Sequence, residues 1–381
     1  MGPRESLREL GRLARTAGAT VVGQTLQRRK KPEPATYIGA GKVDEIHGLR
    51  AETGYSVVIF DEQLSPGQQL RLESALEVKV LDRSALILDI FASRASTREA
   101  ALQVELAQHE YLLPRLRGQW QHLERLEGAI GSRGPGETQL ETDRRLIGGR
   151  ISRLKRQIVG VRNQRELHRT RRRREGIPVV ALVGYTNAGK SSLLQALAGS
   201  ETLTADALFA TLDPLTRRVG TDDAEAFLLT DTVGFIQKLP TQLISAFRAT
   251  LEELESADLL VHVVDTTSEA ASAQSETVLE TLAALGLAGT PMLTVLNKAD
   301  DLALPDGSEP TCEADLARIA IDNPAREAAE AHPDLPNLGT VLVSALTGWG
   351  VAELRARLGY ELFGKGLAAS IPGGDARSLS V

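Results

Sequence analysis

The stretch that most restricts the fold is GYTNAGKS, residues 184–191. It follows the apolar run PVVALVGY, residues 178–185, and precedes a helix-forming segment, so it joins a strand to a helix. A loop of the form Gly-x4-Gly-Lys-Ser places backbone N–H groups and a helix N-terminus around phosphate groups. Lys190 would reach the β- and γ-phosphates, and the Ser191 hydroxyl would ligate Mg²⁺. The sequence therefore predicts a phosphate-binding loop (P-loop) at the end of a buried strand.

Three further motifs lie at the ends of apolar runs downstream. Asp231 is followed by Gly234, so the carboxylate can hold Mg²⁺ through water while the Gly234 N–H bonds a γ-phosphate. In NKAD, residues 297–300, the Asp300 carboxylate can accept hydrogen bonds from N1–H and the 2-amino group of guanine, both of which adenine lacks. Backbone N–H groups of SAL, residues 344–346, can meet guanine O6. Four motifs in this order predict a GTP-binding domain.

The apolar runs that carry these motifs predict the sheet. Strands are expected at residues 178–185, 226–232, 258–265, 291–297 and 339–345. Near-continuous apolar runs are typical of buried parallel strands, and the spacing leaves room for helices between them. We therefore expect residues 176–364 to form a P-loop GTPase domain with a mostly parallel sheet. An acidic, proline-containing insertion at 304–338 has no evident role, and 365–381 is expected to be a flexible tail.

The motifs lack the residue that usually assists hydrolysis. Gly234 is followed by Phe235, which cannot orient an attacking water as a glutamine would. The chain is then either a GTPase with catalytic help from elsewhere, or a GTP-dependent binding switch with negligible hydrolysis that recruits a partner. Asn187 either helps to hold K⁺, as an asparagine does in some related loops, or only caps the loop. Thr211 and Thr216 compete as the switch threonine.

Residues 1–93 alternate short Val- and Ile-rich runs with helical segments. Strands are expected at 19–26, 55–62 and 76–82, and helices at 41–52 and 65–75. In the second helix, Ser65 is expected to be the N-cap and Pro66 the first helical residue. The alternation predicts a small N-terminal α/β domain with a largely parallel sheet.

Two long helical segments follow, at residues 97–116 and 140–174. Between them, residues 127–139 contain four glycines, which argue against regular structure there. The second helix carries a narrow apolar seam, formed by Ile147, Ile151, Leu154, Ile158 and Val161. We expect residues 94–175 to form an antiparallel helical hairpin with the glycine-rich loop at its tip, followed by a basic linker, RTRRRRE, at 169–175.

The net charge of −6 conceals an uneven distribution. Residues 94–175 contain 19 Lys and Arg against 10 Asp and Glu, a net of +9, so the rest of the chain carries −15. A basic segment in an acidic protein indicates a polyanionic partner, although a solvated charged helix has the same composition. The single cysteine, Cys312, cannot form an internal disulfide, which favours a reducing, cytoplasmic compartment. The N-terminus does not resemble a signal peptide, and no apolar run reaches membrane-spanning length.

The segments outside the GTPase motifs are the most specific. They are YIGAGKVDEI (37–46), DEQLSPGQQLRLE (61–73), VLDRSALILDIFASRASTREAALQVELAQHEYLLPRL (80–116) and GSRGPGETQLETDRR (131–145). With them, the chain to about residue 364 resembles the HflX family of GTPases in the Obg-like group. The resemblance implies a GTPase that docks on the large ribosomal subunit and splits or rescues stalled or idle ribosomes. It also implies that Phe235 is a family feature. One departure is Ala129, where the family usually has glycine.

The resemblance also selects the switch threonine. Residues 209–213 resemble the Phe-Thr-Thr-Leu switch of Obg-like GTPases, with Thr211 at the metal-binding position. The expected nucleotide-binding residues are then Gly184, Tyr185, Thr186, Asn187, Ala188, Gly189, Lys190, Ser191, Phe209, Ala210, Thr211, Leu212, Asp213, Asp231, Thr232, Val233, Gly234, Asn297, Lys298, Ala299, Asp300, Ser344, Ala345 and Leu346. The expected catalytic residues are Lys190, Thr211 and Gly234, and the expected Mg²⁺ ligands are Ser191 and Thr211, with Asp231 acting through water.

The expected partner is the large ribosomal subunit and its RNA. The expected RNA-binding residues are Gly131, Arg133, Gly134, Arg150, Arg153, Lys155, Arg156 and Arg162, whose arginines and lysine would neutralise RNA phosphates. The family implies that the hairpin tip approaches the peptidyl-transferase region. We expect a monomer that uses GTP and Mg²⁺, with K⁺ left open, and that has neither DNA as a partner nor integral membrane association.

Overall fold

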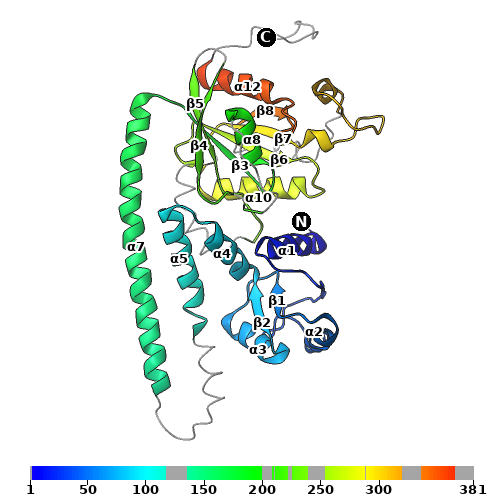
Figure 1. Cartoon of the computed structure of the whole chain (residues 1–381), viewed down its shortest axis with the longest axis vertical. Coiled ribbons are helices and arrows are strands. Elements are labelled where there is room, and N and C mark those ends of the chain that lie inside the picture. Colours follow the sequence, from blue (N-terminus) through cyan, green and yellow to red (C-terminus); the bar gives the residue numbers. More distant parts are fainter. Residues whose placement is uncertain are drawn as a thin grey trace.

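A six-stranded sheet with the order β4-β5-β3-β6-β7-β8 forms the centre of the C-terminal half of the molecule (Figure 1). Its strands are β3 (Val179–Gly184), β4 (Leu215–Gly220), β5 (Ala226–Asp231), β6 (Leu259–Asp265), β7 (Met292–Asn297) and β8 (Asn337–Leu342). All neighbouring pairs are parallel except β4 and β5, so the predicted α/β fold with a mostly parallel sheet is confirmed. β4 escaped prediction because it is an edge strand in which only Val219 is buried.

The structure is a computed structural model that describes part of the chain. It describes residues 2–116, 135–199, 208–209, 211–221, 225–238, 254–287, 289–319 and 336–364, with no side chains for 135–140 and 162–175. The predicted tail, 365–381, lies outside these residues. Within the described ranges, none of the helices combines the length and the apolar character that crossing a membrane requires.

Helices cover both faces of the sheet. α8 (Lys190–Ala198) and α12 (Val351–Phe363) pack in one apolar cluster with Val180 and Leu182 of β3. α10 (Ala271–Ala284) packs in another, with Ala181 and Val183. Because successive strand residues point to opposite faces, the two clusters lie on opposite sides of the sheet. This three-layer arrangement leaves the carboxyl edge of the sheet open for the motif loops.

The N-terminal domain contains a two-stranded parallel sheet, β1 (Val57–Phe60) and β2 (Lys79–Asp82). Around it are α1 (Pro3–Thr16), α2 (Ala40–Thr53), α3 (Pro66–Leu76) and α4 (Arg83–Arg94). Ser65 caps α3 as predicted, in a reciprocal pair with Gln68. The strand predicted at 19–26 is wrong: the segment has no regular structure, and Val22 and Leu26 are exposed. A Val-rich run becomes a strand only where a neighbouring strand can pair with it.

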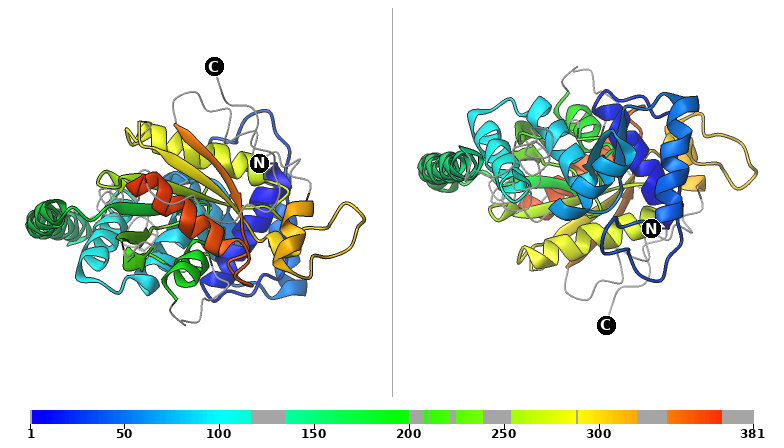
Figure 2. Two further views of the ribbon diagram at one scale, coloured as in Figure 1. Left: turned by 90° about the horizontal axis from the view of Figure 1, so that it is seen from above. Right: turned by 90° about the horizontal axis from the view of Figure 1, so that it is seen from below.

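The hairpin consists of α5 (Arg98–Leu112) and α7 (Pro135–Glu175), which stands at the left edge of both views in Figure 2. The two helices pack along the predicted seam, where Leu154 is completely buried. Ion pairs flank the seam: Arg150 Nη2 to Glu105 Oε1 at 2.6 Å, and Lys155 Nζ to Glu110 Oε1 at 2.8 Å.

Two boundaries of the second hairpin helix differ from the prediction. The helix begins at Pro135, inside the expected loop, because proline is favoured at the first helical position. The expected basic linker at 169–175 is wrong, because these residues continue α7 to Glu175. Arginine has a high helix propensity, and the helix ends only before Gly176, whose φ of 65° lies in the left-handed region.

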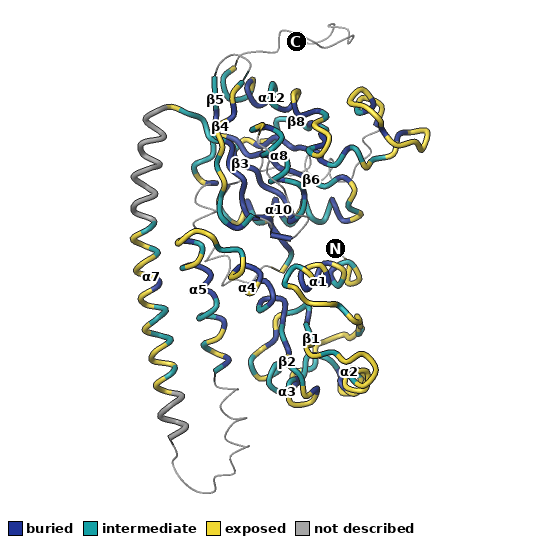
Figure 3. Tube along the Cα trace, viewed as in Figure 1, coloured by how far each residue is buried: buried dark blue, intermediate teal, exposed yellow. Residues whose placement is uncertain are grey.

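One apolar cluster joins the N-terminal domain to the GTPase domain. It contains Leu10, Leu13 and Ala14 of α1, several residues of α4 and α5, and Leu208, Phe209, Leu212, Val233 and Phe235 of the GTPase domain. The rings of Phe91 and Phe209 meet edge to face, with centroids 4.6 Å apart. Figure 3 shows buried positions continuing from the sheet into α4, while most of α7 is exposed or half-buried where it is described. The switch segments therefore share a core with the N-terminal domain.

The buried His262 of β6 should make the stability of the folded protein depend on pH. The side chain is buried, and its Nδ1 has no hydrogen-bond partner among the described residues. Burial, aided by the charge of Lys190, lowers the pKa of His262 from 6.5 to about 4. The unfolded state therefore binds more protons between these values, and the stability from the neutral ring is lost as pH falls through that window.

Because of this histidine, we expect the free energy of unfolding to fall by about 2 kcal/mol when the pH is lowered from 7 to 5. His262→Leu should remove most of that difference, which urea denaturation at the two pH values measures. An equal loss of stability in the variant and the wild type would contradict the assignment.

Candidate nucleotide-binding site

Three oxygens from three segments meet at the carboxyl edge of the sheet. Ser191 Oγ lies 2.7 Å from Thr211 Oγ1, and both hydroxyls donate to Asp231 Oδ2, at 2.6 and 2.8 Å. Asp231 is completely buried, and its Oδ1 has no partner among the described residues. Hard oxygen ligands of this kind suit Mg²⁺. The rival Thr216 lies elsewhere, bonded to Thr230 across β4 and β5 at 2.9 Å.

Lys190 lies at the start of α8, where it closes the P-loop. Its buried Nζ donates to the carbonyls of Gly184 at 3.1 Å and Tyr185 at 2.8 Å. Burial lowers the pKa of Lys190 to about 8, and the nearby Asp231 carboxylate opposes that shift. Gly189 has a φ of 91°, and a Cβ there would lie 2.1 Å from Asn297 Nδ2. Only glycine therefore fits where the P-loop meets the NKAD segment.

The NKAD segment is held by hydrogen bonds to the loops on either side. Asn297 donates from Nδ2 to the Ala188 carbonyl at 2.9 Å and accepts from the Ala345 N–H at 3.0 Å. Asp300 lies in a 3-10 turn, η1 (Ala299–Asp301), and its Oδ1 is buried without a partner among the described residues. An unsatisfied buried carboxylate oxygen is costly, so this one fits a ligand that donates hydrogen bonds.

The part of the site that is expected to hold guanine also contains features that the sequence did not indicate. Lys298 has a φ of 67°, and its Nζ pairs with Asp265 Oδ2 at 2.6 Å. Asp265 was missed, although its position at the end of β6 was the available signal. Ser344 is completely buried, whereas Leu346 is 85% exposed. The hydrogen bond expected between the backbone of 344–346 and guanine O6 stays a prediction.

Phe235 is tied to the P-loop through its backbone. Its N–H donates to the Gly184 carbonyl at 3.0 Å, and its carbonyl accepts from the Thr186 N–H at 2.8 Å. The ring is buried in the cluster shared by the two domains. At Gly234, a Cβ would lie 2.8 Å from the Thr186 Cα and 3.0 Å from Lys190 Nζ. The DTVG segment therefore packs directly against the P-loop, and Phe235 serves as an apolar anchor.

The carboxylate of Asp213 makes its hydrogen bonds outside the nucleotide-binding motifs. The sequence assigned it to the nucleotide site, but its carboxylate accepts from the backbone and hydroxyl groups of Ser96 and Thr97, at the start of α5. Burial alone would raise the pKa of Asp213, but these hydrogen bonds hold it below its ordinary value. The neighbouring Phe209 and Leu212 are buried in the shared core, and Ala210 lies outside the described residues. The segment after Thr211 is thus fastened to the hairpin.

A second polar connection links the P-loop to the N-terminal domain. Tyr185 donates from Oη to Glu9 Oε1 at 2.6 Å, and Glu9 Oε2 pairs with Arg83 Nη1 at 2.7 Å. Arg83 also pairs with Asp61 at 2.6 Å, and Asp61 pairs with Lys238 at 2.6 Å. Burial and the Glu9 carboxylate raise the pKa of Tyr185 above its ordinary value, so its hydroxyl remains a donor. No local pattern in the sequence signals these contacts.

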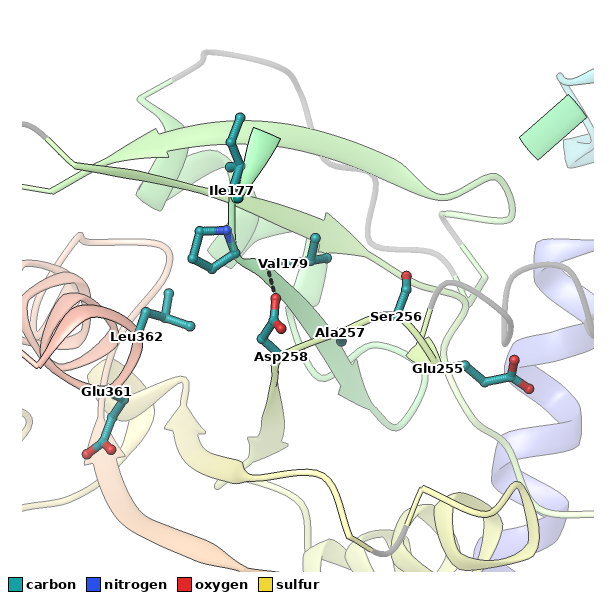
Figure 4. A pocket seen from close by; sticks show the side chains of 10 residues that line it. Ile177, Val179, Glu255, Ser256, Ala257, Asp258, Glu361 and Leu362 are labelled. Carbon is teal, nitrogen blue, oxygen red and sulfur yellow. Dashed lines mark hydrogen bonds between the residues drawn. The ribbon is translucent and has the colours of Figure 1, made fainter. Parts of the chain in front are cut away.

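Two cavities bear on the assignment of the site. One, of about 810 Å³, lies between α1 and the nucleotide motifs, and its lining includes Thr186, Asn187 and Lys298. The other, of about 470 Å³, is shown in Figure 4. There Asp258 Oδ2 accepts from the Val179 N–H at 2.8 Å, at the amino ends of β6 and β3. Ligands of open α/β sheets bind at the carboxyl ends of the strands, so the first cavity belongs to the nucleotide site.

The expected RNA-binding residues fall into three groups. Gly131, Arg133 and Gly134 lie outside the described residues, as does the side chain of Arg162. Arg153 and Arg156 are exposed on α7. Arg150 and Lys155 are paired with α5, but ion pairs this exposed contribute only about 0–1 kcal/mol, so RNA phosphates can compete for them.

Comparisons with known proteins agree with this geometry. Three family models match: GTP-binding GTPase N-terminal at residues 4–92, GTP-binding GTPase Middle Region at 94–172, and 50S ribosome-binding GTPase at 179–298. The chain is 50% identical to GTPase HflX of Alkalihalophilus pseudofirmus over 296 residues, which cover 78% of this chain and 70% of that protein. It is 43% identical to GTPase HflX of Escherichia coli over 361 residues, covering 95% and 80%.

A solved structure is also similar over nearly the whole chain. The crystal structure of a complex of SsGBP with GDP has 28% sequence identity and a TM-score of 0.50, covering 94% of this chain and 95% of that chain.

Proposed function

Because this chain belongs to the HflX family of GTPases, we propose that it docks on the large ribosomal subunit and uses GTP binding and hydrolysis to split or rescue stalled or idle ribosomes. The family membership makes the chain a GTP hydrolase with a GTPase domain of the ribosome-binding type. One observation supports the finer proposal: Asp213, two residues after Thr211, holds Ser96 and Thr97 at the start of the hairpin. A change at the nucleotide can thus reach the element proposed to meet RNA.

The proposed roles follow from the contacts. Ser191 and Thr211 would ligate Mg²⁺, with Asp231 holding it through water. When bound, the ion neutralises charge on the β- and γ-phosphate oxygens. Lys190 and the Gly234 N–H would bind the phosphates. Guanine would be read by Asp300, with the remaining residues of 184–191, 231–234, 297–300 and 344–346 forming the walls of the site. The backbone of 209–213 would complete it beside the γ-phosphate.

The alternative of a binding switch without hydrolysis arose from Phe235. Its burial explains the apolar residue by packing, and its backbone supports the P-loop. Membership of a GTPase family therefore outweighs the missing glutamine. We propose that a positively charged group assists hydrolysis in its absence.

The proposed division of labour uses three parts of the chain. Residues 1–93 would be the N-terminal α/β domain, 94–175 the ribosome-binding hairpin, and 176–364 the GTPase domain. The exposed Arg153 and Arg156 would meet RNA phosphates with a strong dependence on salt. We propose that the protein works as a cytoplasmic monomer.

Replacing residues 128–136 with a short neutral turn tests the hairpin tip. GTP affinity and slow intrinsic hydrolysis should stay near wild type, because none of these residues belongs to the nucleotide-binding motifs. Ribosome binding, ribosome-stimulated hydrolysis and subunit splitting should fall by about tenfold or more, as expected when several RNA contacts are lost. Sedimentation with purified ribosomes and phosphate release measure these quantities.

Ala129→Gly is the matched control for this loop, because it introduces the residue usual in the family without removing any group. It should split ribosomes at least as fast as wild type. If the neutral-turn variant also splits ribosomes at the wild-type rate and at matched salt, the loop is an inert connector and the proposal is wrong.

A further inference from the structure

An arginine-rich wall faces the P-loop across the 810 Å³ cavity. Its members are Arg8, Arg12 and Arg15 of α1 and Arg94 at the end of α4. The opposite side of the cavity includes Thr186 and Asn187 of the P-loop. Figure 1 shows α1 directly below the GTPase domain, between its sheet and the N-terminal strands. The N-terminal domain therefore presents positive charge to a loop that binds phosphates.

Glu9 fixes the position of α1 relative to the P-loop. One of its oxygens accepts from Tyr185, the residue before Thr186, and the other pairs with Arg83. Leu10 and Leu13 anchor the same helix in the core shared by the two domains. The helix is thus held beside the P-loop by a buried hydrogen bond, a buried ion pair and apolar packing.

Arg12 is the member of the wall best placed to reach the phosphates. Residues three positions apart lie on the same face of a helix, so Arg12 stands one turn from Glu9 and therefore near Tyr185. Arg8, adjacent to Glu9 in sequence, is turned by about 100° around the helix. Both Glu9 oxygens are already occupied, and none of the ion pairs between described residues involves Arg12. Arg12 is an exposed residue that lines the cavity, so its guanidinium is available to an anion there.

Hydrolysis needs positive charge at this place. Phe235 can neither orient water nor donate a hydrogen bond from its side chain. The charge that develops on the phosphates still needs compensation, and an arginine supplies it in several GTPases. K⁺ held by Asn187 was the alternative that the sequence left open. Asn187 lines the same cavity as the four arginines, and so do Glu5, Glu9, Asp265 and Glu269. The local charge therefore does not decide between Arg12 and K⁺, and the experiment below compares the two.

We propose that Arg12 contacts the phosphates of GTP from the N-terminal domain and supplies the positive charge that stabilises the transition state of hydrolysis. The inference rests on the placement of GTP proposed above. It makes the N-terminal domain part of the catalytic site, with Arg8, Arg15 and Arg94 raising the local positive potential. A guanidinium can contact two phosphate oxygens at once, which an ammonium or K⁺ cannot do in the same planar geometry.

The test measures single-turnover hydrolysis of GTP with the protein in saturating excess, with fluorescent-nucleotide binding in parallel. Arg12→Ala should slow hydrolysis by about 100-fold, as the loss of one transition-state donor does, with a much smaller change in GTP affinity. Arg12→Lys should recover only part of the rate, and millimolar guanidinium should accelerate Arg12→Ala but not wild type. Arg4→Ala removes an exposed arginine of the same helix outside the cavity and should match wild type.

The outcomes separate this inference from the proposed nucleotide site. If Arg12→Ala binds GTP and hydrolyses it at the wild-type rate, the arginine is not the source of charge, although the site stands. Wild-type hydrolysis that is several-fold faster in KCl than in NaCl, and equally so in Arg12→Ala, would assign the charge to K⁺ and overturn the inference. Failure of the wild type to bind GTP would overturn the proposed site itself.

Discussion

Asp300→Asn is expected to convert the protein from a GTP-binding to a xanthosine-triphosphate-binding protein. The buried Asp300 Oδ1 lacks a partner among the described residues and would accept from the guanine N–H groups. An amide in its place would face those donors with its own NH₂, while matching the 2-oxo group of xanthine. Loss of charged hydrogen bonds of this kind weakens binding by on the order of 100-fold. Competition of each triphosphate against a fluorescent guanine nucleotide measures the change.

Asp301→Asn is the matched control, because the same substitution is made one residue later at an exposed position. It should bind GTP like the wild type. Unchanged GTP affinity in Asp300→Asn would mean that this carboxylate does not read the base, and the assignment of NKAD as the guanine-binding segment would be wrong.

Asp213→Ala is expected to uncouple the ribosome from hydrolysis. The carboxylate is the acceptor for Ser96 and Thr97 at the start of α5, so its removal cuts the polar link between the switch segment and the hairpin. Coupling between sites typically corresponds to 5- to 150-fold effects, and we expect the ratio of ribosome-stimulated to basal hydrolysis to fall about tenfold. Ribosome affinity in the presence of a nonhydrolysable GTP analogue should fall far less.

Asp89→Ala serves as the comparison, since Asp89 is exposed on the nearby α4. It should keep the wild-type ratio of stimulated to basal rate. An Asp213→Ala protein with the same ratio would show that the contact with α5 is only structural. Asp213→Asn retains one acceptor oxygen and should give an intermediate ratio.

Much of the nucleotide site could be predicted because its residues are contiguous. The P-loop, the DTVG segment and NKAD each follow a strand, and parallel strands bring their carboxyl ends to one edge of the sheet. Local order in the sequence therefore becomes proximity in space. The choice of Thr211 over Thr216 needed a family pattern, because both threonines lie between the same two motifs.

The contacts between domains could not be predicted in this way. Glu9 and Tyr185 are 176 residues apart, and Asp213 and Ser96 are 117 apart. Such pairs have no periodicity or motif of their own, because they depend on how two domains pack against each other. The wrong strand at 19–26 has a related cause, since β-propensity takes effect only where a neighbouring strand is present. α1 mixes charged and apolar residues, so its role follows only from its contacts. Leu10 and Leu13 pack in the core shared by the two domains, and Arg12 lines the cavity beside the P-loop.

The continuous helix α7 has a mechanical consequence. Its 41 residues form a rod of roughly 60 Å, which leaves the GTPase domain at Glu175 and reaches its far end at Pro135 (Figure 1). A tilt of about 5° at the base of a rod this long moves the far end by about 5 Å, more than the length of a hydrogen bond. α7 is thus a lever that turns a rearrangement of a few degrees beside the sheet into a displacement large enough to break contacts at the other end of the molecule.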